Sequence, residues 1–140
     1  MGIIKSKIII DGRLLIQEYS GEINKNDMLV YFDGLYQNSE YLGVSAIFSD
    51  FTNANAVLTV GDIVEVAHFI LEHAPKVQNI SNAILVIEPL ITAYSILYEE
   101  IMRKMPFYKC RIFSTFNEAA NFINYDISDL KDLLRTSFAN

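Results

Sequence analysis

The sequence from Thr59 to Pro89 reads TVGDIVEVAHFILEHAPKVQNISNAILVIEP, and this stretch decides the fold class. Thr59 and Asp62 are spaced as a capping box, which predicts that a helix begins there. Apolar residues then recur at helical spacing until Pro75, which stops the helix. The run Ala83–Ile87 is wholly apolar, as expected for a strand with both faces covered. The stretch therefore predicts a helix, then a central strand, then a helix opened by its last proline.

The flanking sequence continues this alternation in both directions. Asp11-Gly12 separates two apolar runs, which predicts a hairpin, because a type I′ turn needs positive φ at both central positions. Strands are expected at Lys7–Ile10, Leu14–Tyr19, Val44–Ser49, Ala83–Ile87 and Cys110–Phe113. Helices are expected to begin at Asn24, Thr59, Pro89, Thr115 and Ser128. The polar residues 50–55 are interpreted as a loop, and Gly21 as the end of the second strand.

The order of these elements predicts the architecture. Strands that alternate with helices indicate parallel crossovers, so we expect an α/β domain with a mostly parallel sheet and an N-terminal β-hairpin. Four to five helices should flank the sheet. The 140 residues match the commonest size of a single domain. We therefore expect one domain over residues 1–140, with a core at about 7–124 and a C-terminal helix at about 126–137.

Composition excludes some partners. The chain has 11 basic against 17 acidic residues, which argues against nucleic acid, since such binding needs Lys and Arg to neutralise phosphates. The small basic group Arg103, Lys104, Lys109 and Arg111 is interpreted as a solvated helix end and strand flank. Cys110 is the one cysteine, so no disulfide can form within the chain, and we expect a buried, inert thiol. No apolar run reaches the ~18 residues of a membrane span, and we expect a cytoplasmic protein.

Scattered residues resemble one family. They are Gly21-Glu22-Ile23, Asp50-Phe51-Thr52, Pro89 with Tyr94 and Tyr98, Arg111 to Thr115, and Glu118-Ala119-Ala120 with Phe122 and Ile123. With the order of elements, they resemble the STAS domain of bacterial anti-sigma-factor antagonists, and more narrowly its sporulation-protein-AA-like branch. The resemblance covers about residues 8–123. It implies a SpoIIAA-like fold and a regulatory module that binds a protein.

The family's phosphorylation turn is altered in this chain. Signalling STAS domains carry Asp-Ser-Ser-Gly at the start of the second helix, where the resemblance places Leu58-Thr59-Val60-Gly61. Thr59 is the one hydroxyl left in this turn. A phosphate there would meet the free N–H groups of the helix start. The unmodified hydroxyl, however, already has a role as the helix cap, and we favour that reading.

The catalytic and metal-binding motifs in this sequence are absent or incomplete. Glu65 and His68 share a helix face, but a di-iron bundle needs two such pairs and two further Glu. His68 and His73 are five residues apart and point in different directions, so they do not form a zinc site together. The chain has no G-x-S-x-G elbow, P-loop or G-x-G-x-x-G fingerprint. We expect no enzyme, no cofactor and no metal.

Two binding functions remain. In the first, the protein docks on a protein partner through the second helix and a rim at the carboxyl ends of the strands, with candidate residues Asp50, Thr52, Asn53, Asn55 and Thr59. In the second, it carries or senses a small apolar or amphipathic ligand. The candidate wall of that site is Tyr94, Tyr98 and Met102 on the third helix, because Met adapts its shape and Tyr has a polar tip. We also consider association with membrane surfaces and a homodimer.

Overall fold

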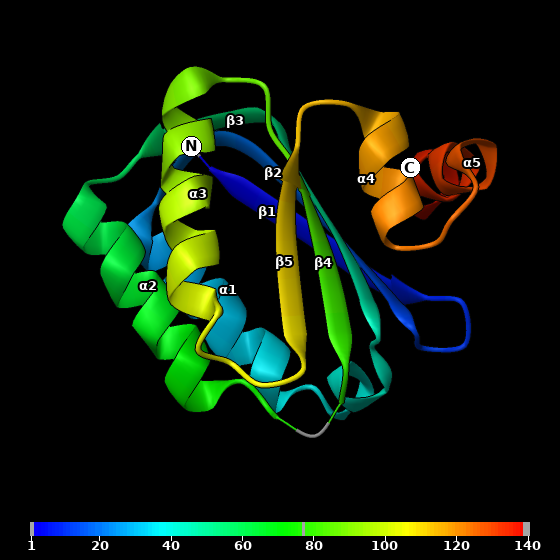
Figure 1. The fold of residues 1–140 in the computed structure, drawn as a ribbon, viewed down its shortest axis with the longest axis horizontal. Helices are drawn as coiled ribbons and strands as arrows, with labels where there is room; N and C mark the ends of the chain where they lie inside the picture. The colour runs from blue at the N-terminus through cyan, green and yellow to red at the C-terminus, as the bar shows by residue number, and fades with distance from the viewer. Residues whose placement is uncertain (1, 77, 139–140) are drawn as a thin grey trace.

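The structure, a computed structural model, describes residues 2–76 and 78–138. The strands are β1 (Ile3–Ile9), β2 (Leu14–Asn24), β3 (Ala46–Val57), β4 (Ile80–Leu85) and β5 (Tyr108–Phe113). The helices are α1 (Lys25–Gln37), α2 (Val60–His73), α3 (Pro89–Met102), α4 (Phe116–Phe122) and α5 (Ile127–Ser137), with a 3-10 turn η1 (Ser39–Gly43) after α1. This confirms the predicted α/β order (Figure 1).

The sheet has the strand order β1-β2-β3-β4-β5. β1 and β2 are antiparallel, and every other neighbouring pair is parallel, as the sequence predicts. The hairpin turns at Asp11 and Gly12, whose φ angles are 55° and 81°, and the N–H of Arg13 donates to the carbonyl of Ile10 at 3.1 Å. Positive φ at both central positions is the signature of the type I′ turn that Asp-Gly favours.

The prediction of a polar loop at residues 50–55 was wrong. β3 continues to Val57, and Ser20 to Asn24 of β2 pair with Asn53 to Val57 after a register shift. The extension alternates: Ala54 is buried, while its neighbours Asn53 and Asn55 are exposed. Asparagine has a low strand propensity, so this segment was not identified as a strand. Its alternation of buried and exposed residues is nevertheless that of a strand with one buried face. The same pairing carries β2 past Gly21, where the sequence had predicted its end.

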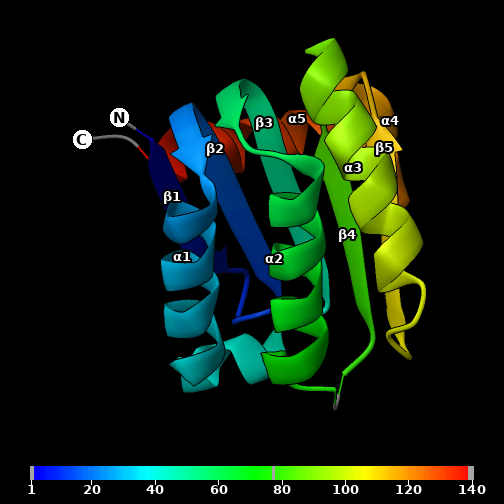
Figure 2. The ribbon, with the colours of Figure 1, turned by 90° about the vertical axis from the view of Figure 1, so that its left-hand side faces the viewer.

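Helices cover both faces of the sheet. α1, α2 and α3 lie side by side on one face, and α4 and α5 lie on the other (Figure 2). The larger apolar core packs between the sheet and α1–α3. In α2, the buried stripe is Ile63, Val66, Ala67 and Ile70. The smaller core, which includes Phe48, Ala83 and Leu130, packs under α4 and α5.

Candidate functional site

Three polar side chains lie buried within the larger core. Gln17 of β2, Ser49 of β3 and Asn82 of β4 are 3%, 2% and 5% exposed. They lie on the sheet face under α1–α3. Leu15 and Ile47, two positions before Gln17 and Ser49 on the same strands, point to that face and pack in the larger core. Nε2 of Gln17 donates to Oγ of Ser49 at 2.9 Å, and Oγ of Ser49 donates to Oδ1 of Asn82 at 2.9 Å. The three side chains thus form a hydrogen-bonded row across the sheet.

Tyrosines continue this row at both ends. The hydroxyl of Tyr31 on α1 donates to Oε1 of Gln17 at 2.6 Å. At the other end, Nδ2 of Asn82 donates to the hydroxyl of Tyr108 on β5 at 2.8 Å, which lies 3.2 Å from the hydroxyl of Tyr98 on α3. We call the six residues the polar row: Tyr31, Gln17, Ser49, Asn82, Tyr108 and Tyr98. The polar row crosses four strands and ties two helices to them, and its hydrogen bonds offset the cost of burying polar groups.

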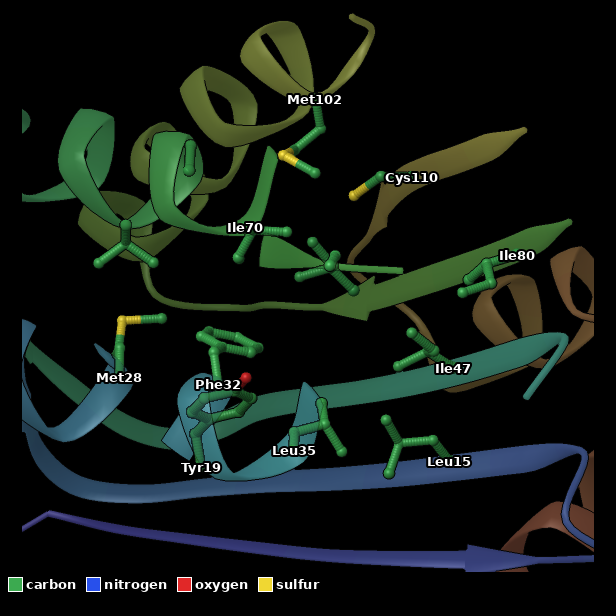
Figure 3. Packing of buried hydrophobic residues seen from close by; sticks show 14 of the residues in the cluster. Leu15, Tyr19, Met28, Phe32, Leu35, Ile47, Ile70, Ile80, Met102 and Cys110 are labelled. Carbon is green, nitrogen blue, oxygen red and sulfur yellow. The ribbon is translucent and has the colours of Figure 1, made fainter. Parts of the chain in front are cut away.

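A cavity lies over the polar row. Its volume is about 80 Å³, and its walls come from the sheet and from α1, α2 and α3. The walls are mostly apolar: Tyr19, Met28, Phe32, Leu35, Ile47, Ile70 and Ile80 contribute to them, and Figure 3 shows these side chains meeting between the helices and the sheet. Five members of the polar row line the same space, all except Tyr31. An apolar chamber with a few fixed polar groups is the usual form of a small-molecule site.

The polar row has hydrogen-bonding capacity to spare. A carboxamide carries two N–H groups, yet among the described residues Nε2 of Gln17 and Nδ2 of Asn82 each donate one hydrogen bond. Both amides line the cavity. An oxygen acceptor inside the cavity can therefore receive a hydrogen bond from either of them.

A further polar atom lies at one end of the cavity. Nε2 of Gln78 donates to the carbonyl of Tyr41 at 2.9 Å, while its Oε1 is buried and has no hydrogen-bond partner among the described residues. Lys76 lines the cavity at this end too. A buried acceptor without a partner is costly, so this oxygen is a place where a donor on a bound molecule would be stabilised.

The predicted wall on α3 is partly in place. Tyr94 and Tyr98 line the cavity. The hydroxyl of Tyr94 donates to the carbonyl of Leu58 at 2.7 Å, which ties α3 to the start of α2. Met102 is not on the cavity wall: it is 1% exposed and lies near Cys110 in the core (Figure 3). Met105, which follows α3, lines the cavity instead.

The tyrosine hydroxyls and the thiol near the polar row stay in their neutral forms. Burial raises the pKa of Tyr98 and of Tyr108 well above the ordinary value near 10. Burial also raises the pKa of the Cys110 thiol, so it is not an activated nucleophile. Among the described residues that line the cavity there is no Asp, Glu or His. This chemistry suits hydrogen bonding to a bound molecule.

The predicted rim residues lie along the second half of β3 and at the start of α2. Oδ1 of Asp50 accepts hydrogen bonds from the N–H and Oγ1 of Thr52 at 2.9 and 2.7 Å, a local turn within β3. Asn53 and Asn55 alternate with alanines that line the cavity, so they point to the opposite sheet face. Thr59 lies at the start of α2, where its Oγ1 accepts from the N–H of Asp62 at 3.1 Å.

Four exposed apolar side chains lie at or just beyond the carboxyl ends of β3 and β4. Val57 ends β3, Val60 begins α2, Ile87 follows β4 and Leu90 lies in the first turn of α3. Their exposed fractions range from 48% to 67%. We call these four residues the apolar edge.

The polar row was not predicted from the sequence, although three of its strands carry a polar residue at an inward position. Gln17, Ser49 and Asn82 stand at positions that period-two alternation assigns to the buried face, next to Leu15, Ile47 and Ile84 on the same strands. A polar residue at an inward position predicts a buried hydrogen-bonding group.

The comparison with solved structures agrees with the fold described above. An uncharacterised protein of the DUF3478 family from Shewanella loihica PV-4, described as having a SpoIIAA-like fold, aligns over 87% of this chain and 93% of its own. The TM-score is 0.55 and the sequence identity 16%. This chain has a SpoIIAA-like fold. At this sequence identity, the similarity concerns the fold and not the function.

Other comparisons add nothing to the SpoIIAA-like assignment. No family model matches the sequence, and no curated protein matches it. Within residues 2–76 and 78–138, no helix is both long and apolar enough to cross a bilayer. The same residues contain no cluster of three or more His, Cys, Asp or Glu side chains placed to hold a metal.

Proposed function

We propose that the protein is a non-catalytic binding module that takes a small amphipathic molecule into the cavity over the polar row. The observation that carries this proposal is the placement of Gln17, Ser49 and Asn82 along a mostly apolar chamber. A core that served packing alone would be more simply filled with apolar side chains, since buried polar groups require complete hydrogen bonding.

The ligand's chemistry follows from the groups it would meet. An apolar body suits the walls, and an oxygen acceptor near its middle or end suits the amides of Gln17 and Asn82. The cavity of about 80 Å³ is smaller than the ~150 Å³ cavity that holds benzene in an engineered protein, so the walls must adjust. Met28 and Met105 line the cavity, and methionine is the residue that re-packs most readily.

The test compares matched probes on the purified protein. Hexan-2-one and hexane have similar apolar bodies, but only the ketone has an oxygen acceptor. We expect hexan-2-one to raise the melting temperature and to shift the NMR amide signals of Gln17 and Asn82, with a weaker response to hexane. With protein purified from cells, native mass spectrometry should detect a bound molecule, and solvent extraction should release it. Protein that is empty and unresponsive to both probes would contradict the proposal.

A variant that fills the cavity supplies the control. Ala56 lines the cavity, and Val57 follows it on the exposed side of β3. Ala56→Leu should abolish the response to hexan-2-one, and Val57→Leu should preserve it. Equal responses from the two variants would place the ketone elsewhere.

The apolar edge supports a second candidate function, the docking of a protein partner at the carboxyl ends of the strands. Exposed apolar side chains that gather in one region often mark an interface. The helix starts beside them bring carboxylates, those of Asp62 and Glu88, so the partner would present basic and apolar side chains. Pull-down at native expression should recover a stoichiometric partner that Val60→Asp loses and that Val30→Asp, at an exposed valine of α1, retains. Recovery of no partner would contradict this candidate.

A further inference from the structure

A second concave surface lies at the amino ends of the strands, opposite the apolar edge. It is an open groove of about 850 Å³, bounded by the starts of β2 to β5 and by the turn between α4 and α5. Backbone hydrogen bonds fix its floor: the N–H of Ser45 donates to the carbonyl of Arg13 at 2.9 Å, and the N–H of Ser81 donates to that of Ser45 at 3.0 Å. The groove is therefore built on the rigid sheet.

The charge of this groove is opposite to that of the whole chain. Arg13 and Lys109 line it, and none of the described residues that line it is Asp or Glu. The chain as a whole carries a net charge of −6. Lys109 belongs to the basic group that the sequence analysis interpreted as solvated, but the fold brings it together with an arginine 96 positions earlier in the numbering. A groove that combines cations without a carboxylate favours an anion.

The strand register places the two cations at opposite ends of one row of residues. Leu14, Ala46, Ser81 and Lys109 are in register across β2 to β5. Neighbouring strands lie ~4.8 Å apart, so the row is about 14 Å long. Arg13 precedes one end of the row, and Lys109 stands at the other. Ser45 and Ser81 line the groove between these two ends, and each carries a hydroxyl that can donate a hydrogen bond.

Aromatic rings flank the groove at both ends. Phe107 directly precedes β5, its side chain is 67% exposed, and its φ of 64° is unfavourable for a bulky residue. Strained backbone conformations cluster at functional sites. Tyr125 lines the other end, where burial raises the pKa of its hydroxyl and the nearby Arg13 guanidinium partly offsets that rise. Each end of the groove therefore contains one cation and one aromatic ring.

We propose that this groove binds a small aromatic acid, meaning a molecule with one anionic group attached to an aromatic ring. The anion lies over Ser45 and Ser81 between Arg13 and Lys109, and the ring stacks on Phe107 or Tyr125. This site is independent of the cavity over the polar row, so either proposal can fail without the other.

Phenyl phosphate is the probe, with inorganic phosphate and phenol as its two halves. We expect phenyl phosphate to shift the NMR amide signals of Ser45, Ser81 and Lys109 saturably. Inorganic phosphate alone and phenol alone should each bind at least about tenfold more weakly than phenyl phosphate. Arg13→Gln and Lys109→Gln should each weaken phenyl phosphate binding about tenfold, which corresponds to the loss of one charge-assisted hydrogen bond. Phe107→Ala should reduce the advantage of phenyl phosphate over inorganic phosphate.

Lys5→Gln is the matched control, because it removes the same charge from β1, away from the groove. It should leave the affinity unchanged. The proposal is overturned if phenyl phosphate shifts no groove signals, if it binds no better than inorganic phosphate, or if Lys5→Gln weakens binding as much as Lys109→Gln does. The cavity variant Ala56→Leu should bind phenyl phosphate normally.

Discussion

Ser49 and Asn82 stand 33 residues apart in the sequence, and Oγ of Ser49 donates a 2.9 Å hydrogen bond to Oδ1 of Asn82 in the centre of the larger core. The same hydroxyl accepts from Nε2 of Gln17. Ser49 is thus the central link of the polar row, and each neighbour depends on it. Removing one partner from a buried hydrogen bond costs more than the bond contributes, because the other partner stays desolvated.

Replacing this serine tests that dependence. Ser49→Ala leaves an amide N–H of Gln17 and Oδ1 of Asn82 without their partner, and we expect a loss of about 2–4 kcal/mol in the free energy of unfolding. Urea denaturation followed by circular dichroism measures it. Ser114→Ala, at an exposed position after β5, should change stability by less than ~0.5 kcal/mol. A loss below that size for Ser49→Ala would mean that water replaces the hydroxyl.

The buried tyrosines predict a loss of stability at alkaline pH. Burial raises the folded-state pKa of Tyr98 and Tyr108 above the unfolded value near 10. Their contribution is therefore fully present below pH ~10 and is lost as the pH rises through the folded-state values. Urea midpoints measured from pH 8 to 11.5 should fall above pH ~10. Tyrosinate absorbance should rise together with unfolding.

Tyr98→Phe separates this effect from the titration of lysines. The variant lacks one of the buried hydroxyls whose pKa is raised, so its urea midpoint should fall less steeply between pH 10 and 11.5 than that of the wild type. Identical slopes in the two proteins would rule out Tyr98 as a source of the pH dependence.

The cap of α2 predicts different outcomes for two substitutions of Thr59. Its Oγ1 accepts from the N–H of Asp62, and a carboxylate of Asp62 accepts from the N–H of Thr59 in return. Thr59→Ala should cost about 1 kcal/mol, whereas Thr59→Asp should retain the cap, since Asp is as good at this position. Thermal denaturation distinguishes them. Equal destabilisation by both would show that the negative charge of Asp62 overrides the cap.

Two glycines should respond to alanine with opposite signs. Gly12 has a φ of 81° in the hairpin turn, so Gly12→Ala should cost about 1 kcal/mol. Gly34 lies inside α1, and a Cβ there meets nothing within 4 Å, so Gly34→Ala should stabilise by up to ~1 kcal/mol. Urea denaturation of both variants checks the pair. Stabilisation by Gly12→Ala would contradict the type I′ turn.

Local chemistry made most of the fold predictable. Helix starts are set by residues within four positions of one another, so Asn24, Thr59 and Thr115 could be identified as caps from the sequence, and all three cap helices in the structure. The alternation of strands and helices then predicted a mostly parallel sheet. The extension of β3 escaped this reasoning, because its pairing with the end of β2 joins residues about 33 positions apart.

The α/β order, the hairpin and the helix caps could be predicted before folding is considered, because those features depend on neighbours along the chain. The polar row, whose hydrogen bonds join residues 10 to 33 positions apart, and the groove, which is lined by the starts of four strands, arise only when the chain folds. The physical reason is that parallel strands bring distant residues into one row. Which polar side chains meet in that row depends on the strand register, and register is fixed by the packing of both sheet faces.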